Sequence, residues 1–316
     1  MTFARKSSLA LAVLACSIAA QTNAATIYSN DKVTYNVKGD FQIQLRKKAG
    51  NDQKLDVEFD DLELKNSIVY KIDEQLSAFG QLDFSFDSEG NDQSKDSSKL
   101  EEAYVGLDFD GTRVSIGRQN LAGDEFGVEA AYETHTAEDR FEQVADKGDD
   151  VIRVETQLGQ VTLIGSALVG AETSNNAAGE AIDLFASTDL SGLKLAAAYQ
   201  NYNDNLPGSE DQQTWGVSAA YNFGSLKLAA DYSTTDTGSQ DAEVTNLVAS
   251  YKFSDQVKTS VGVVWSEEGN NDAQEWYANA TYTFAGQKNV SLFAEIADTD
   301  ETDVSLGYMT GLQIKF

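Results

Sequence analysis

Polar and apolar residues alternate along most of this chain, and this alternation limits the folds that the chain can adopt. Between Val33 and Arg46, apolar residues or glycine occupy the odd-numbered positions and polar residues occupy the even-numbered ones. Residues two apart point to the same face of a β-strand, so this segment predicts a strand with one apolar and one polar face. The pattern recurs and predicts sixteen strands, at 33–47, 57–71, 76–86, 100–108, 112–119, 150–158, 161–169, 181–190, 193–200, 213–222, 226–233, 244–252, 257–265, 275–284, 290–297 and 303–316.

The connectors between the predicted strands alternate between short and long. The short set covers 72–75, 109–111, 159–160, 191–192, 223–225, 253–256 and 285–289. The long, polar set covers 49–56, 87–99, 120–149, 170–180, 201–212, 234–243, 266–274 and 298–302. Short periplasmic turns and long extracellular loops are typical of outer-membrane barrels. We therefore expect an all-β fold, a sixteen-stranded antiparallel transmembrane β-barrel with both chain ends on the periplasmic side.

A secreted soluble all-β protein would also contain alternating strands, and the aromatic residues distinguish the two folds. After residue 25, no apolar run approaches the roughly 20 residues that a membrane helix needs. Outward aromatics lie at strand ends: Tyr70, Tyr221, Tyr251, Phe284 and Phe316 at the periplasmic end, and Phe86, Tyr199, Trp215, Tyr232, Trp265 and Trp276 at the other. One ring of aromatics at each membrane interface favours the barrel, because a soluble core would not confine them to strand ends.

Small residues occupy many inward positions in the middle of the chain. They are Ala196, Ala198, Gly216, Ser218, Ala229 and Gly262. The core of a β-sandwich would need bulky side chains at these positions. We expect small inward residues to leave a lumen, which about sixteen strands make wide enough for an aqueous channel.

The first 24 residues have the pattern of a secretory signal peptide. Arg5 and Lys6 precede an apolar run from Leu9 to Ala20, and the small residues Thr22 and Ala24 fit a cleavage site. We expect residues 1–24 to be removed and residues 25–316 to form the barrel. Cys16 permits a second interpretation as a lipidation site, but a lipid anchor is redundant on a spanning barrel. Without Cys16 the mature chain has no cysteine and therefore no disulfide.

The chain is strongly acidic. It has 51 Asp and Glu residues against 23 Lys and Arg, and loss of Arg5 and Lys6 leaves 21, a net charge of −30. This charge excludes nucleic acid as a partner. Most of the charged residues lie in segments rich in Gly, Asn and Ser, where solvated loops are expected, and the regular alternation argues against disorder.

The longest connector, 120–149, is far longer than joining two strands requires. A polar loop at the mouth of a wide barrel can fold inward and hydrogen-bond to the polar wall, where its carboxylates would favour cations. The candidate constriction residues are Glu125, Glu129, Glu133, Glu138, Asp139 and Arg140. The candidate wall residues are Arg46, Lys65, Arg113, Arg118 and Arg153, of which Arg118 points inward only if its strand bulges or ends there. Ordinary salt bridges along the wall are the alternative role for these bases.

The sequence resembles the general porins of Gram-negative bacteria. The resemblance rests on Ala25-Thr-Ile-Tyr-Ser-Asn30, Glu102-Ala-Tyr-Val-Gly-Leu-Asp108, Val114-Ser-Ile-Gly-Arg-Gln119, Asp150-Val-Ile-Arg-Val154 and the final strand from Tyr308 to Phe316. It implies a homotrimer in the outer membrane, a constriction formed by the third extracellular loop, and a salt bridge between a new N-terminus at Ala25 and the Phe316 carboxylate. Arg118 matches the family's Gly-Arg step, but the loop motif Pro-Glu-Phe-Gly-Gly is not reproduced. We expect a weak preference for cations.

Passive diffusion of small hydrophilic solutes and ions is the function that these features favour. A substrate-selective channel, for example for oligosaccharides, would use inward aromatics as a sliding surface. Tyr104, Phe185, Tyr277 and Phe293 are inward but dispersed. A pore-free adhesin or structural barrel is the remaining alternative.

Neither an enzyme nor a metalloprotein is expected. The only histidine, His135, lies in the long loop without a nucleophile motif around it. No loop has the ligand spacing of a known calcium motif, so we expect no cofactor and no metal site. Membrane lipid and lipopolysaccharide, the latter bridged to acidic loops by divalent cations, are the expected partners besides small solutes.

Overall fold

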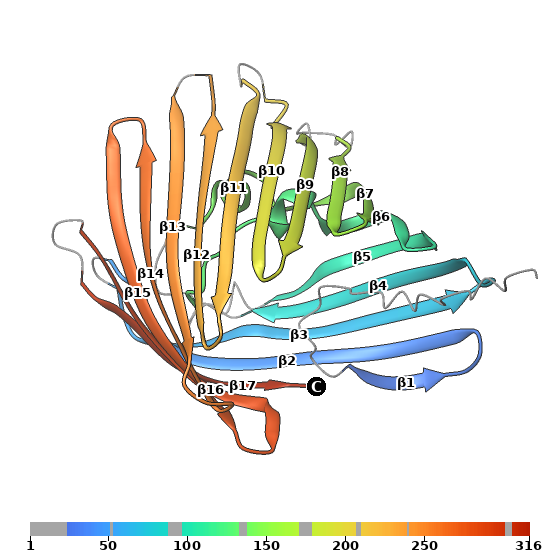
Figure 1. Ribbon diagram of the computed structural model, residues 1–316, viewed down its shortest axis with the longest axis horizontal. Helices are drawn as coiled ribbons and strands as arrows, with labels where there is room; N and C mark the ends of the chain where they lie inside the picture. Colours follow the sequence, from blue (N-terminus) through green and yellow to red (C-terminus); the bar gives the residue numbers. More distant parts are fainter. Residues whose placement is uncertain are drawn as a thin grey trace, which may run out of the picture.

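The computed structural model describes residues 24–50, 53–87, 97–132, 138–170, 179–206, 210–238, 240–300 and 305–316. Seventeen strands form one closed antiparallel sheet, in which each strand pairs with its neighbours in the sequence and β17 pairs with β2. The strands are β1 (Ala25–Ser29), β2 (Val33–Lys47), β3 (Asp56–Lys71), β4 (Leu76–Asp87), β5 (Ser97–Phe109), β6 (Thr112–Asn120), β7 (Lys147–Leu158), β8 (Val161–Leu168), β9 (Glu180–Leu190), β10 (Leu193–Asn203), β11 (Gln212–Phe223), β12 (Leu226–Asp236), β13 (Asp241–Lys252), β14 (Val257–Glu268), β15 (Asn271–Phe284), β16 (Gln287–Thr299) and β17 (Gly307–Lys315) (Figure 1).

The first and last strands lie end to end beside β2, so the wall is sixteen strands around. β17 pairs with residues 40–47 of β2, and β1 continues the same edge by pairing with residues 34–37. Figure 1 shows the C-terminus close to the start of β1. The sequence pattern predicted β2 to β17 but not β1, because five residues are too few to show an alternation.

The connectors are short on one rim and longer on the other, as predicted. In the turn between β5 and β6, Asp110 and Gly111 have φ angles of 52° and 88°, the left-handed conformation that tight hairpins require. The prediction of long loops at 234–243 and 266–274 was wrong. The connector between β12 and β13 covers only residues 237–240, and the connector between β14 and β15 covers only 269–270. Their charged residues continue the ladder, for example Glu267 opposite Asp272. Charged residues can therefore continue a strand where it extends beyond the membrane.

The outer face of the wall is apolar and has aromatics at its ends. Toward the turns, Tyr221 and Phe223 form an edge-to-face pair with ring centroids 4.5 Å apart, and Tyr251 and Phe253 form another at 4.7 Å. Trp215 packs on Tyr232 near the opposite ends of β11 and β12. The two belts of aromatic residues, one at each end of the wall, therefore lie on the outer face, as expected for a barrel in lipid. Within the described residues, no helix is long and apolar enough to cross a membrane.

The space inside the barrel is partly filled by the segment between β6 and β7, drawn in green behind β9 to β12 in Figure 1. It contains the one-turn helix η1 (Ala122–Glu125) and the short helix α1 (Arg140–Val144). The expectation that the small inward residues leave an open lumen was wrong for this half of the wall. Ala198 and Ala229 are buried in clusters that include loop residues, and a side chain at Gly216 would collide with the ring of Phe126. Small wall residues make room for the loop.

Candidate functional site

The loop between β6 and β7 lies against the inner wall and is hydrogen-bonded to strands far away in the sequence. At its start, the backbone N–H of Ala122 donates to Ser166 Oγ on β8 at 2.8 Å. Further along, the N–H of Ala130 donates to the Tyr277 hydroxyl on β15 at 2.9 Å. On the return, the N–H of Arg140 donates to Ser233 Oγ on β12 at 3.0 Å. The loop therefore crosses the lumen from β8 to β15 and comes back.

Aromatic side chains hold the same loop by packing. Phe126 and Phe141 lie 5.0 Å apart between ring centroids and form one buried cluster with Phe185 of β9. Tyr132 stacks on Phe293 of β16 at 4.6 Å. Inward aromatics of the wall thus contact the loop, which explains why they are dispersed along the sequence. Burying several aromatic rings contributes a few kcal/mol to loop docking.

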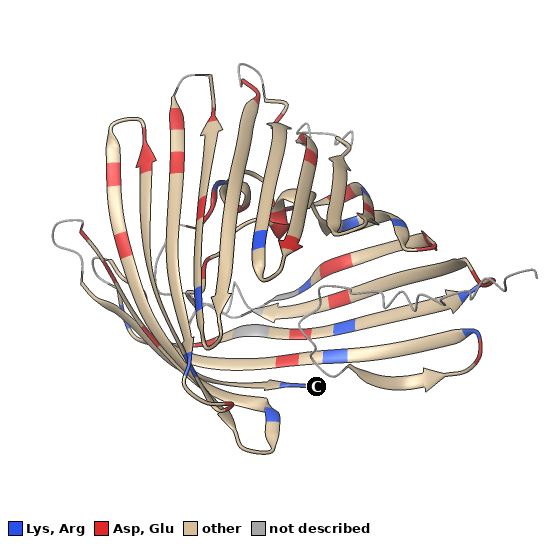
Figure 2. Ribbon diagram, viewed as in Figure 1, with Lys and Arg blue, Asp and Glu red and all other residues tan. Residues whose placement is uncertain are grey.

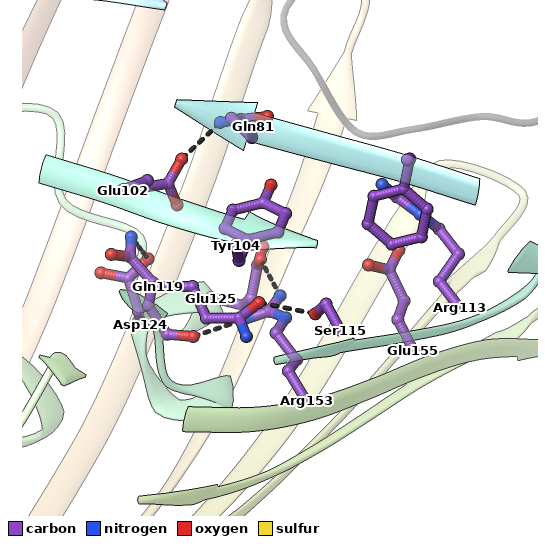
Figure 3. A pocket seen from close by; sticks show the side chains of 12 residues that line it. Gln81, Glu102, Tyr104, Arg113, Ser115, Gln119, Asp124, Glu125, Arg153 and Glu155 are labelled. Carbon is purple, nitrogen blue, oxygen red and sulfur yellow. Dashed lines mark hydrogen bonds and ion pairs between the residues drawn. The ribbon is translucent and has the colours of Figure 1, made fainter. Parts of the chain in front are cut away.

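A polar recess of about 300 Å³ lies between the start of this loop and the wall formed by β4 to β7 (Figure 3). Its lining residues are Phe79, Gln81, Glu102, Tyr104, Arg113, Ser115, Gln119, Asn120, Asp124, Glu125, Arg153 and Glu155. The recess carries four carboxyl groups and two guanidinium groups. Charged groups of the loop and of the wall therefore share this recess.

Arg153 and Arg113 occupy different environments in the recess. The Arg153 guanidinium donates to the carbonyl oxygens of Asn120 and Leu121 at 3.2 and 2.9 Å and pairs with Glu125 at 2.6 Å. It therefore fixes the start of the loop. The Arg113 guanidinium lies over the Phe79 ring, 4.1 Å from its centroid, which holds its charge against the wall.

The other three predicted wall bases lie outside the recess. Arg46 is buried and pairs with Glu58 at 2.5 Å, and Lys65 pairs with Glu63 at 2.7 Å. Arg118 lies at a β-bulge, because the β6–β7 register shifts between Gly117 and Gln119. Its guanidinium pairs with Asp149 and donates to the Glu101 carbonyl at 3.1 Å.

The predicted loop residues also separate. Glu125 lines the recess, while Glu129 is half-buried in the stretch that crosses the lumen. Arg140 Nε donates to Thr235 Oγ1 at 3.1 Å, which ties the base to the wall. Glu138 is exposed, and its hydrogen bond to Glu142 raises the pKa of the Glu142 carboxyl. Glu133 and His135 lie outside the described residues.

Two loop carboxyls have a shifted pKa because they are buried. Asp139 caps α1 by accepting hydrogen bonds from the N–H groups of Phe141 and Glu142 at 2.8 and 3.3 Å. Burial raises the pKa of Asp139 to about 7, although these two bonds oppose the rise. Burial also raises the pKa of Asp124 to about 6, against a hydrogen bond from Asn120. Both groups therefore titrate in the physiological range.

Ala25 and Phe316, the predicted closure residues, lie on the same edge of β2. The backbone of Phe316 exchanges two hydrogen bonds with Gly39, at 2.9 and 3.0 Å. Ala25 lies opposite Val37, two residues further along β2. The Phe316 ring stacks on Phe41 at 5.7 Å. The ion pair between a new amino terminus and the Phe316 carboxylate stays a prediction.

Several residues of this site were not identified from the sequence. Glu102, Glu155, Gln81 and Gln119 line the recess, and Asp183, Asp231 and Glu295 bind the loop from the wall. Their only sequence signal is a carboxyl or amide group at an inward strand position. Among the described side chains, no group of three or more His, Cys, Asp or Glu residues is placed to hold a metal ion.

The chain is similar to known outer-membrane proteins along nearly its whole length. Its sequence matches the profile of the family described as Gram-negative porin over residues 7–304. It is 26% identical to Porin-like protein H of Photobacterium profundum over 342 aligned positions, covering 99% of this chain and 100% of that protein. It is 23% identical to Outer membrane protein U of Vibrio parahaemolyticus over 303 positions, covering 89% of this chain and 86% of that protein.

The fold is also that of solved outer-membrane barrels. OmpT of Vibrio cholerae, folded in vitro and in its trimer form, superposes with a TM-score of 0.76 at 15% identity. The superposition covers 90% of this chain and 100% of OmpT.

Proposed function

Because this chain belongs to the Gram-negative porin family and is an outer-membrane β-barrel, we propose that its channel admits small hydrophilic solutes and ions by passive diffusion. The observation that carries the proposal is the docked loop, which packs against one side of the inner wall and leaves the polar recess beside it. A passage lined by carboxyl, amide and guanidinium groups hydrates polar solutes and disfavours apolar ones.

The inward aromatics argue for general diffusion over selection of sugars. Phe185 and Phe293 pack against the loop, and the Tyr277 hydroxyl accepts a hydrogen bond from it. Of the four inward aromatics considered from the sequence, only Tyr104 lines the recess. A sliding surface for a chain of sugar rings needs several exposed rings in succession.

The charges of the recess favour a weak cation preference. Arg153 is neutralised by Glu125, and the Arg113 charge faces Glu102, Asp124 and Glu155 across the same recess. Excess carboxylate gives a negative potential in a narrow polar passage. Constriction by Glu125, Glu129 and Glu133 together is part of this proposal.

We further propose that the protein is exported by residues 1–24 as a signal peptide and assembles as a homotrimer. The trimer form of OmpT supports the assembly, since the two folds superpose over 90% of this chain. The acidic loop ends of the barrel offer carboxylates to which divalent cations could bridge lipopolysaccharide.

Planar-bilayer recording of the purified protein tests the proposed function. Stepwise currents are expected, with a reversal potential in a KCl gradient that indicates more permeation by K⁺ than by Cl⁻. Lack of any conductance would instead support a pore-free adhesin or structural barrel. Block of the current by oligosaccharides at low concentration would support the substrate-selective alternative.

The recess is tested by neutralising two of its carboxylates, in Glu102→Gln and Glu155→Gln. Both changes should lower the permeability ratio of K⁺ to Cl⁻. Glu74→Gln is the matched control, because Glu74 is exposed in the turn between β3 and β4 and does not line the recess. An equal change in the control would mean that net charge, and not the recess, sets the selectivity.

A further inference from the structure

Three pairs of inward residues on the wall behind the loop share one arrangement. In each pair a carboxylate and a carboxamide lie directly opposite on neighbouring strands: Asp183 and Gln200, Asp231 and Asn246, and Glu295 and Asn279. The carboxamide donates to the carboxylate at 2.9, 3.0 and 2.9 Å, respectively. Since directly opposed side chains on one face of a sheet are close neighbours, the register of the sheet brings each pair together.

Each of the three carboxylates also binds the loop. Asp183 accepts a hydrogen bond from the backbone N–H of Gly123 at 3.2 Å. Asp231 accepts one from Val128 at 2.8 Å, and Glu295 one from Tyr132 at 2.7 Å. The three carboxylates are at most 4% exposed, so these charge-assisted bonds form away from bulk water.

Two of the carboxamides also bind the loop, by donating a hydrogen bond to one of its carbonyl groups. Gln200 Nε2 donates to the carbonyl of Ala145 at 2.7 Å, and Asn279 Nδ2 donates to the carbonyl of Ala130 at 2.6 Å. Gly123 and Ala145 belong to the outgoing and the returning leg of the loop. The pair Asp183–Gln200 therefore holds both legs at the place where they enter and leave the lumen.

The loop needs such external partners. Between η1 and residue 132 it has no regular secondary structure, so no helix or sheet ladder satisfies its backbone groups. Buried backbone N–H and C=O groups require partners. The wall supplies them at fixed points along β9, β12 and β16, and these points determine where the loop crosses.

We infer that the three acid–amide pairs are positioning residues of the channel, which fix the path of the loop across the lumen and thereby set the width of the passage. The inference rests on the proposed channel function. Asp183–Gln200 is the main pair of the three, because it is hydrogen-bonded to both legs of the loop.

This main pair also predicts which substitution preserves the loop. Within the described structure, Asp183 Oδ1 and Gln200 Oε1 are both buried without a hydrogen-bond partner. An asparagine at position 183 keeps an oxygen for Gly123 and for Gln200 Nε2, and its NH₂ group can donate to Gln200 Oε1. Asp183→Asn should therefore rescue what Asp183→Ala loses.

Single-channel recording at neutral pH tests the inference. Asp183→Ala and Gln200→Ala are each expected to raise the single-channel conductance by roughly 1.5-fold and to add fluctuation between levels, because the released loop no longer narrows the passage. Asp183→Asn should return the conductance to near the wild-type level. Glu295→Ala, at the far end of the loop, should add fluctuation with a smaller rise in mean conductance.

Gln313→Ala is the matched control. Gln313 donates a hydrogen bond to Asp40 at 3.0 Å on the wall formed by β17 and β2. The substitution therefore removes the same kind of bond at a place that does not contact the loop. Wild-type conductance in Asp183→Ala and Gln200→Ala, or an equal change in Gln313→Ala, would overturn the inference. A wild-type protein without conductance would overturn the proposed function instead, so the two failures are distinguishable. Thermal unfolding of each variant confirms that the barrel itself remains folded.

Discussion

At the scale of single residues, neighbouring acids of the loop lie in different surroundings. Glu125 pairs with Arg153 at 2.6 Å, whereas the adjacent Asp124 is buried and the burial raises its pKa to about 6. Asp139, fifteen positions later, has its pKa raised to about 7 by burial. The sequence identified these residues as acids, but their charge near neutral pH depends on what surrounds them in the fold.

We expect the cation preference of the channel to increase between pH 5 and pH 8. Both shifts raise the pKa, so Asp124 and Asp139 are mostly protonated at pH 5 and ionised at pH 8. The same shifts mean that Asp124 and Asp139 bind protons more tightly in the folded protein than in the unfolded chain. The docking of the loop on the inner wall should therefore weaken as the pH rises through about 6 to 7.

Reversal potentials measured across this pH range check the expectation. Asp124→Asn should flatten the part of the curve near pH 6, because it removes one titrating group. A selectivity that stays constant from pH 5 to pH 8 in the wild type would contradict the assigned pKa shifts.

At the scale of elements, the seam of the barrel depends on a glycine. Periodicity predicted the barrel strands because in-and-out alternation is a local property of each strand. It did not predict that β1 and β17 would share one edge of β2, which depends on pairing between the two ends of the chain. At this junction the Phe316 ring covers Gly39, and an added Cβ at Gly39 would collide with the ring.

Gly39→Ala is therefore expected to destabilise the barrel by about 1–3 kcal/mol, because the Phe316 ring must move to admit the methyl group. Thermal unfolding followed by circular dichroism measures the effect. Gly80→Ala is the matched control, since an added Cβ there meets its nearest neighbours at 3.5 Å, an ordinary contact distance. Equal unfolding temperatures for the two variants would show that Gly39 does not hold the terminal ring.

At the scale of the whole molecule, charge is distributed unevenly along the barrel axis. Lys194, Lys227 and Lys258 are exposed next to the turns, and the charge of Lys227 interacts with the other two. The opposite ends of β12 to β15 carry Asp and Glu residues, as Figure 2 shows. Lys194, Lys227 and Lys258 share the inward parity of Ala196, Ala229 and Gly262. They therefore form a positive patch at the turn-side ends of β10, β12 and β14, opposite the acidic ends of β12 to β15.

This axial asymmetry predicts an asymmetric current–voltage curve. Ions of either sign meet opposite potentials when they enter from the two sides, so the current at equal and opposite voltages should differ. Replacing Lys194, Lys227 and Lys258 with glutamine should reduce the difference, whereas Lys54→Gln, an exposed change in the connector between β2 and β3, should not. Recordings at 0.1 M and 1 M salt add a check, because screening should weaken the asymmetry at high salt.

The sequence by itself determined the wall of this protein: how many strands surround it, which residues face lipid or lumen, and on which rim the turns lie. Each of these follows from periods of two residues and from local turn chemistry, which act over short stretches of chain. Tertiary structure alone decided where the long loop lies, because its anchors are distant in sequence; Tyr132 and Glu295 are 163 positions apart. It also decided that Ala198 and Ala229 make room for the loop, and which carboxylates bind the loop instead of facing the passage. These outcomes depend on the register and closure of the whole barrel, which bring together residues that no local pattern connects.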